Sequence, residues 1–112
     1  MKDTVTFDDF SKIDFKVGRV VGAENIEGAE SLMRLRVDFG SLGERTILSG
    51  IKKWYQPEAL EGKNFIFVVN LKPKKIMGEE SCGMIIAAES DDKESCVLLI
   101  PDKEIAPGTS VH

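Results

Sequence analysis

Positively charged side chains in the middle of this sequence are the residues best placed to do chemistry. Residues 33–78 hold nine Lys and Arg against four Asp and Glu, a net charge of +5, whereas the rest of the chain carries −9. The densest cluster is Lys72-Pro73-Lys74-Lys75, where proline restricts the backbone between three cations. Ammonium groups arranged in this way bind the phosphates of a polyanion. The cluster predicts a local nucleic-acid patch. The net charge of −4 excludes a protein that coats DNA through bulk positive charge.

Residues for acid–base catalysis or metal binding are scarce. The single histidine, His112, is the last residue, so neither a catalytic triad nor a histidine-centred acid–base pair has a candidate base. Cys82 and Cys96 have no nearby histidine and lack the spacing of a structural zinc site. We therefore expect two free thiols, no catalytic residue, no metal and no cofactor.

Short β-strands are the elements that must position the cations. Apolar and alternating runs predict strands over residues 15–24, 34–39, 45–49, 65–69, 84–89 and 97–100. Gly18, inside the first run, predicts a bulge or a bend. A capping box that starts at Thr6 predicts a helix over 7–13, and Pro57 predicts the first turn of a second helix within 52–60. About six strands with little helix favour a closed or nearly closed barrel.

The second predicted strand indicates how such a barrel would present its charge. Leu35, Val37 and Phe39 alternate with Arg34 and Arg36, so the two arginines are expected on the outward face. In barrels of the OB type, the face of strands 2 and 3 meets oligonucleotides. The two arginines are therefore candidates for contact with nucleic acid.

Aromatic residues indicate which kind of nucleic acid this surface would bind. Proteins that bind single strands stack bases on exposed rings. The buried patterns contain four phenylalanines: Phe15, Phe39, Phe65 and Phe67. Trp54 and Tyr55, beside Lys52 and Lys53, could either stack bases or pack against the core. A basic surface with few stacking rings favours recognition of the backbone shape of a folded RNA.

Length and hydropathy limit the architecture. A chain of 112 residues fits one domain, spanning 1–112. Its longest apolar runs, 65–69 and 84–88, have five residues each, against the roughly 20 that span a bilayer. The N-terminus has no apolar segment typical of a signal peptide. We expect a cytoplasmic protein that has no membrane partner.

Five ordered motifs, spread from about residue 7 to the C-terminus, suggest a family. They are Asp14-Phe15-Lys16-Val17-Gly18-Arg19-Val20, Leu48-Ser49-Gly50-Ile51, Pro57-Glu58-x-Leu60-x-Gly62-Lys63, Asn70-Leu71-Lys72-Pro73-Lys74-Lys75-x-x-Gly78 and Ser81-x-Gly83-Met84. The series resembles the tRNA-binding domain appended to many methionyl-tRNA synthetases. Stand-alone tRNA-binding proteins and cofactors of the endothelial monocyte-activating polypeptide type share this domain.

The resemblance implies both a fold and a function. The implied fold is all-β: an OB-fold five-stranded barrel with a short N-terminal helix and a C-terminal strand-containing extension. The implied function is structure-specific binding of tRNA by a homodimer without catalytic activity, with the methionyl-tRNA synthetase catalytic chain as a further candidate partner. The candidate tRNA-binding residues are Asn70, Lys72, Lys74, Lys75, Ser81 and Met84 from the motifs, Lys52 and Lys53 beside them, and Arg34 and Arg36 from the strand pattern.

Two alternatives stay open. A related branch of the same fold is described as an export chaperone, and a module of this kind would dock proteins through exposed apolar faces. This chain keeps the two motifs at which that branch diverges, and its outward positions are expected to be largely cationic. The run 97–100 is apolar on both faces, so one face could pack either inside the monomer or against a second copy.

Overall fold

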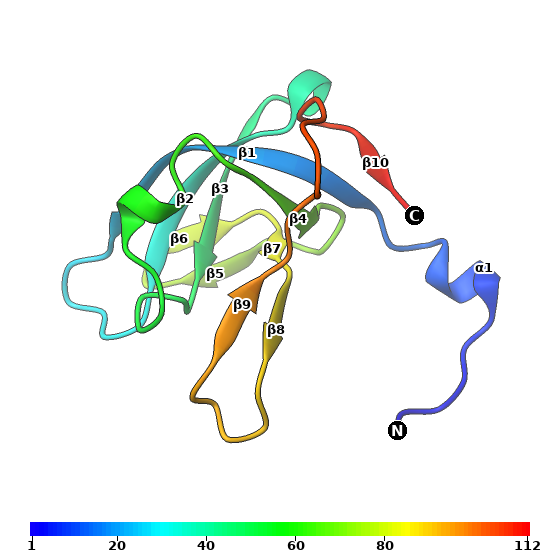
Figure 1. The fold of residues 1–112 in the computed structure, drawn as a ribbon, viewed down its shortest axis with the longest axis horizontal. Coiled ribbons are helices and arrows are strands. Elements are labelled where there is room, and N and C mark those ends of the chain that lie inside the picture. Colours follow the sequence, from blue (N-terminus) through cyan, green and yellow to red (C-terminus); the bar gives the residue numbers. More distant parts are fainter.

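A curved antiparallel sheet forms the body of the molecule in the computed structural model, which describes residues 1–112 (Figure 1). Its strands follow the order β3-β2-β1-β4-β7. Their bounds are β1 Phe15–Asn25, β2 Met33–Asp38, β3 Glu44–Ser49, β4 Asn64–Val68 and β7 Met84–Ile85. The N–H of Cys82 donates to the carbonyl of Thr46 at 2.9 Å, which brings the chain at Cys82 back against β3. The sheet thereby curls into the predicted OB-like barrel.

The long strand β1 pairs with different neighbours along its two halves. Its first half, from Phe15 to Arg19, pairs with β4, and its second half, from Arg19 to Asn25, pairs with β2. The register shifts between Val20 and Gly22, so the bulge lies there. The bulge or bend predicted at Gly18 is not a bulge, because the register shift lies further along β1.

Gly18 is explained by close packing instead. A β-carbon at this position would lie 2.6 Å from side-chain carbons of both Val37 and Phe39, which is closer than van der Waals contact allows. Only a glycine therefore lets β1 pass over the interior of the barrel at this point.

The core follows from the alternation in β2. Leu35, Val37 and Phe39 are fully buried, as predicted, and they meet Ile47 from β3 and Phe67 from β4. The rings of Phe39 and Phe67 pack edge to face with centroids 5.2 Å apart. The barrel is therefore a packed core that orients the hairpins attached to it.

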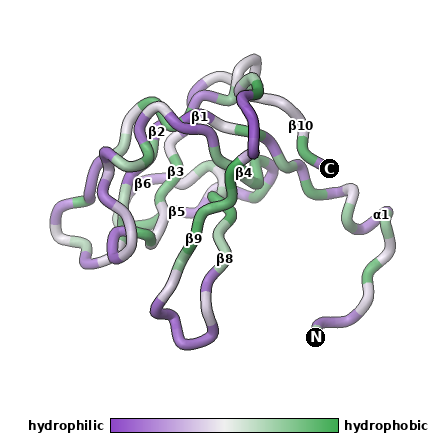
Figure 2. The backbone as a smooth tube through the Cα atoms, viewed as in Figure 1, coloured by the Kyte–Doolittle hydropathy of each residue, from purple (hydrophilic) through white to green (hydrophobic).

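Two short hairpins and a terminal strand are added to the barrel. β5 Lys74–Ile76 pairs with β6 Glu79–Ser81, and β8 Ala87–Glu89 pairs with β9 Cys96–Leu98. The β8–β9 hairpin projects from the barrel, and the C-terminal strand β10 Ser110–Val111 pairs with the start of β1 (Figure 1). Figure 2 shows hydrophobic residues along β9 and hydrophilic ones along β5.

The predicted strand over 84–89 is two strands that belong to different sheets. β7 pairs with β4, and β8 pairs with β9. Between them, Ile86 donates to the carbonyl of Ile66 at 2.9 Å and accepts from the N–H of Leu99 at 3.2 Å. The apolar run does not reveal this change of partner, because both strands use the same residue types.

Helical structure is shorter than the sequence predicted. The helix α1 spans Phe7–Phe10, and the hydroxyl of Thr6 accepts the N–H of Asp9 at 3.1 Å, as a cap should. It ends early because none of its residues is buried. The second helix expected within 52–60 is a short 3₁₀ helix, Pro57–Ala59, with Pro57 in its first turn as expected, and residues 52–54 form a turn. No helix of the chain is long and apolar enough to cross a membrane.

Candidate nucleic-acid interface

The β5–β6 hairpin carries two of the predicted cations. Lys74 and Lys75 were expected in a loop, but they lie on β5, opposite Ser81 and Glu80 of β6. The two-residue turn is Met77-Gly78, in which both residues are left-handed, with φ of 51° and 81°. Such turns usually contain Asn-Gly or Asp-Gly, so methionine concealed the hairpin from a sequence-based prediction.

Lys72, Lys74 and Lys75 are exposed, and we call them the lysine cluster. Lys74 and Lys75 are consecutive in β5, so their side chains lie on opposite faces of the hairpin. The ammonium nitrogen of each of the three lysines lies more than 4.0 Å from every carboxylate oxygen. Elsewhere in the molecule, five pairs of basic and acidic side chains lie within that distance. Their ammonium groups therefore keep their full charge available to a ligand in solvent. The three lysines that the sequence singled out are thus exposed and free of ion pairs.

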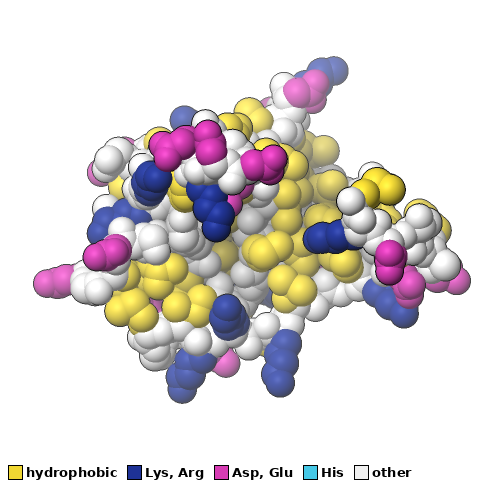
Figure 3. Space-filling model, turned by 90° about the horizontal axis from the view of Figure 1, so that it is seen from below, with side chains coloured by type: hydrophobic (Ala, Val, Ile, Leu, Met, Phe, Trp, Pro, Cys, Tyr) yellow, Lys and Arg dark blue, Asp and Glu magenta, His cyan; other side chains and the backbone are white.

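An apolar groove of about 470 Å³ lies beside the lysine cluster. Its apolar lining comes from Leu48, Leu71, Ile76 and Met84, and its polar lining from Lys72, Lys74, Ser81 and Gly83. Leu71 and Met84 are 46% and 48% exposed, so they are open to a ligand. Figure 3 shows one face of the molecule on which hydrophobic side chains gather with Lys and Arg spaced around them. The arrangement suits a ligand that has both anionic and apolar parts.

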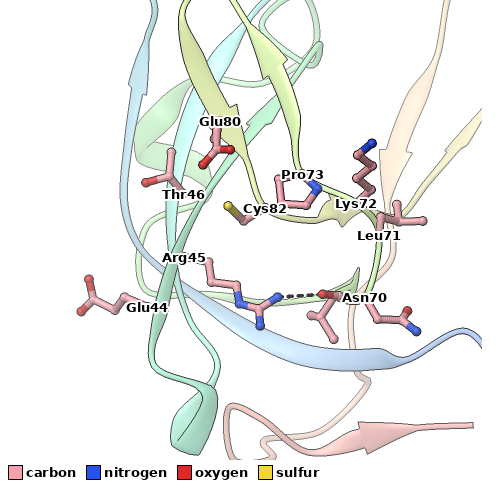
Figure 4. Close-up of a pocket in the computed structure, with 10 residues that line it drawn as sticks. Glu44, Arg45, Thr46, Asn70, Leu71, Lys72, Pro73, Glu80 and Cys82 are labelled. Carbon is pink, nitrogen blue, oxygen red and sulfur yellow. Dashed lines mark hydrogen bonds between the residues drawn. The ribbon is translucent and has the colours of Figure 1, made fainter.

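A second pocket, of about 750 Å³, also borders the segment 71–73 (Figure 4). Arg45 of β3 reaches across it and donates from Nη1 to the carbonyl of Val69 at 2.7 Å. The carboxylates of Glu44 and Glu80 also line this pocket. Arg45 was not among the predicted site residues. It lies on a strand within the basic region 33–78, and this position could have identified it from the sequence.

Arg34 and Arg36 do project from the barrel, but acidic side chains meet them. Arg34 Nη1 donates to Glu24 at 2.6 Å, its Nε donates to Glu79 at 2.7 Å, and its Nη2 donates to the second oxygen of Glu79. Three of the five N–H groups of a guanidinium are thus occupied. Arg36 Nε lies 3.1 Å from Glu44, with both side chains exposed. Direct contact of these arginines with phosphate stays a prediction, and the neighbouring carboxylates oppose it.

The ion pairs shift the pKa values of Arg34 and of its partner Glu79. The hydrogen bonds from Arg34 lower the pKa of Glu79 below 4.5, against an opposing effect of desolvation. The bonds to Glu79 and Glu24 raise the pKa of Arg34. Both side chains therefore stay charged around neutral pH.

Asn70 and Ser81 use their polar atoms within the protein. Asn70 accepts the N–H of Asp14 at 2.8 Å and donates to the carbonyl of Lys12 at 2.6 Å. The buried hydroxyl of Ser81 accepts the N–H of Leu48 at 3.0 Å and donates to the carbonyl of Gly83 at 3.3 Å. These side chains hold the two ends of the segment that carries the lysine cluster. The structure thus places both beside the candidate interface, with their hydrogen-bonding atoms directed inward.

Lys52 and Lys53 lie apart from the groove. Lys52 Nζ donates to the carbonyl of Ala29 at 3.1 Å, and Lys53 Nζ lies 5.5 Å from the centroid of the Trp54 ring. Trp54 and Tyr55 pack against the core, so the structure selects packing over an exposed stacking platform for these rings. Neither lysine lines the groove or the pocket.

Both cysteines are free thiols, as predicted. Cys82 lines the pocket beside Arg45, and Cys96 is buried in the core. Burial, followed by the charge of Glu89, raises the pKa of the Cys96 thiol. Cys96 is therefore a packing residue.

Comparison with known proteins gives a consistent set of similarities. Residues 15–110 match the family model described as "Putative tRNA binding domain". The methionine–tRNA ligase of Archaeoglobus fulgidus is 48% identical over 110 residues, which cover 98% of this chain and 16% of that protein. The chain thus spans about one sixth of the length of the curated relatives it matches.

Two solved structures match over their whole length. The crystal structure of a MetRS related protein from Pyrococcus horikoshii has a TM-score of 0.93 at 47% identity, covering 99% of this chain and 100% of that one. The crystal structure of the chaperone CsaA from Bacillus anthracis has a TM-score of 0.89 at 33% identity, covering 98% and 100%. Both similarities extend over the barrel and its two hairpins.

Proposed function

This chain belongs to the tRNA-binding domain family, and we propose that it is a non-catalytic module that binds tRNA by its structure. The module is the C-terminal domain of a methionyl-tRNA synthetase, a separate subunit of one, or a stand-alone protein, and it acts in the cytoplasm. By holding tRNA close to a synthetase catalytic chain, it raises the effective concentration of the substrate there. The observation that carries the proposal is the lysine cluster, three unpaired cations of which Lys72 and Lys74 line an apolar groove.

The chemistry of this surface matches the outside of a folded RNA. Lys72, Lys74 and Lys75 bind backbone phosphates, and Leu71 and Met84 in the groove contact the apolar faces of sugars and bases. Trp54 and Tyr55 are packed on the core, so these rings leave no stacking platform for a single strand. A surface of this kind recognises backbone shape, which all tRNA species share.

Charge reversal tests the proposal. We expect the double variant Lys74→Glu/Lys75→Glu to bind mixed tRNA on the order of 100-fold more weakly in a filter assay, because two attractive contacts become repulsive. The matched control is Lys63→Glu/Lys103→Glu, which changes the same charge at two lysines that line a different pocket. The control should bind within about twofold of the unmodified chain.

Salt dependence and competitors sharpen the test. With about three phosphate contacts, one from each lysine of the cluster, the slope of log affinity against log salt should be about −2 to −3. A flat salt titration, equal loss in the two double variants, or preference for short single-stranded RNA over tRNA would each contradict the proposal.

We also propose that the module is a homodimer. Val97, Leu99 and Ile100 are 58%, 40% and 64% exposed, whereas Cys96 and Leu98 on the same strand face the core. An apolar face of this kind on a projecting hairpin suits a two-fold interface with a second copy.

The groove also favours a second candidate function, docking of proteins. Outward positions were expected to be largely cationic, yet Leu71 and Met84 open onto an apolar groove, and the chaperone CsaA shares the fold. Competition separates the two functions. Displacement of bound tRNA by an unfolded polypeptide, with polypeptide binding retained in Lys74→Glu/Lys75→Glu, would favour docking of proteins.

A further inference from the structure

The ion cluster of Arg34, Glu24 and Glu79 has no assigned part in the proposed binding of tRNA. Arg34 lies in β2, Glu24 opposite it in β1, and Glu79 at the start of β6. The cluster therefore connects the wall of the barrel to the hairpin that carries Lys74 and Lys75. Arg34 and Glu79 are 45 positions apart in the sequence, so the link depends entirely on the fold.

The β5–β6 hairpin is bonded to the barrel at two places. At its root, Ser81 accepts from the N–H of Leu48, and the following residue, Cys82, donates to Thr46. At its turn end, Glu79 directly follows Met77-Gly78 and accepts from Arg34. Because β5 and β6 form a sheet of their own, no ladder of backbone bonds joins them to the barrel. Without the contact to Arg34, the hairpin could swing about its root.

The geometry of the contact between Arg34 and Glu79 favours one orientation of the hairpin. Two parallel N–H donors of a planar guanidinium meet both oxygens of one carboxylate, which fixes direction as well as distance. The side chains of Arg34 and Glu79 are 32% and 34% exposed, and Glu24 holds Arg34 from its other side. A pair at this level of exposure contributes little to overall stability, but it can select one arrangement of a small hairpin.

We propose that Arg34 is a positioning residue that holds the β5–β6 hairpin through Glu79, so that Lys74 presents its charge together with Lys72 at the groove, with Lys75 on the opposite face of β5. This inference rests on the proposed binding of tRNA. It replaces the direct phosphate contact that the sequence predicts for Arg34 with an indirect role.

Glu79 gives the sharpest test, because the two explanations predict opposite signs. If only charge mattered, Glu79→Ala would remove an acid near the lysine cluster and strengthen binding of tRNA. As part of the positioning contact, Glu79→Ala should instead weaken binding about three- to tenfold. The matched control is Glu80→Ala, which removes the same charge from the neighbouring position of β6, where Glu80 makes no ion pair. Glu80→Ala should leave binding unchanged or strengthen it.

Arg34 variants supply two further readouts. Arg34→Gln should weaken binding of tRNA as much as Glu79→Ala and leave the salt slope unchanged, since no phosphate contact is lost; a direct contact would reduce the slope by about 0.7 to 0.9. Arg34→Lys, which keeps one charge pair, should fall between Arg34→Gln and the unmodified chain. Hydrogen exchange measured by mass spectrometry should increase in residues 72–82 of Arg34→Gln, with the core strands still protected.

The outcomes separate this inference from the proposed function. Loss of binding in Lys74→Glu/Lys75→Glu, together with equal or stronger binding in Glu79→Ala, would overturn the positioning role alone. A reduced salt slope in Arg34→Gln would overturn it in favour of a direct contact. If charge reversal of the two lysines leaves binding intact, the proposed function itself fails.

Discussion

The β5–β6 and β8–β9 hairpins each pair two three-residue strands, but they expose different side chains and are held by different forces. Lys74 and Lys75 are exposed on the first hairpin, whereas Val97 is exposed on the second. The first is tied to the barrel by Ser81 and by the Arg34–Glu79 pair. Directional polar bonds therefore hold the charged hairpin.

The β8–β9 hairpin is instead fixed by burial. Cys96 and Leu98 belong to the core, Tyr55 Oη accepts the N–H of Leu98 at 3.1 Å, and Trp54 Nε1 donates to the carbonyl of Glu94 at 3.1 Å. An apolar strand can bury one face and keep the other for a partner. Strand β5 offers only Ile76, which is half-buried, for apolar packing, so the position of this hairpin depends more on the polar contacts of Ser81 and Glu79.

The largest expected effect comes from placing a charge on the apolar hairpin. We expect Val97→Lys to weaken self-association on the order of 100-fold, because an ammonium group would lose its water in an apolar interface. Sedimentation velocity measures the change, and Leu42→Lys, on an exposed 3₁₀ turn, is the control. A chain that sediments as a monomer before substitution, or as an unchanged dimer after it, would contradict the proposed interface.

The second prediction compares the anchors of the two hairpins. Ser81→Ala leaves the N–H of Leu48 without its acceptor, and Tyr55→Phe does the same to the N–H of Leu98. Each should lower the free energy of unfolding by about 1–3 kcal/mol in urea titrations. Ser81→Ala should also weaken binding of tRNA, whereas Tyr55→Phe should not. Equal effects of the two variants on tRNA affinity would show that the hairpins do not act separately.

The third prediction concerns the turn of the lysine hairpin. Met77 has a φ of 51°, a region that asparagine tolerates better than methionine. We expect Met77→Asn to raise the free energy of unfolding by about 0.5–1 kcal/mol. Gly78→Ala, at a φ of 81°, should lower it by about 1 kcal/mol. Thermal unfolding of the two variants measures both effects, and the same sign in both would exclude this explanation of the turn.

The barrel was predictable because its signals are local. Leu35, Val37 and Phe39 alternate along β2 and occupy the core as expected. The features that were missed depend on neighbours in space. Position 18 must be a glycine because the side chains of Val37 and Phe39 leave no room for a β-carbon, and the chain passes from one sheet to another at Ile86. A linear pattern carries no information on either.

The candidate site was predictable to the extent that it depends on residue type. The lysine cluster could be identified from the sequence because exposed lysines need no partner. The partners of Arg34 could not, since Glu79 is distant in sequence and only the fold brings them together. Asn70 belongs to a motif of the binding segment, yet its amide bonds to the backbone of Lys12 and Asp14, a role that depends on the fold.

The smallest expected effect is a dependence on pH confined to acidic conditions. Arg34 lowers the pKa of Glu79 below 4.5, so the ion pair contributes fully to stability above about pH 4.5 and is lost as the pH falls through the lowered pKa. Hydrogen exchange of residues 72–82, corrected for its intrinsic pH dependence, should show constant protection from pH 6 to 8 and lower protection under more acidic conditions, before the core unfolds. In Arg34→Gln, protection should already be low at pH 7, with a weaker change on acidification. The β8–β9 hairpin, which burial holds, should keep its protection over the same range. If both hairpins lost protection together, the distinction between polar and apolar anchoring would not hold.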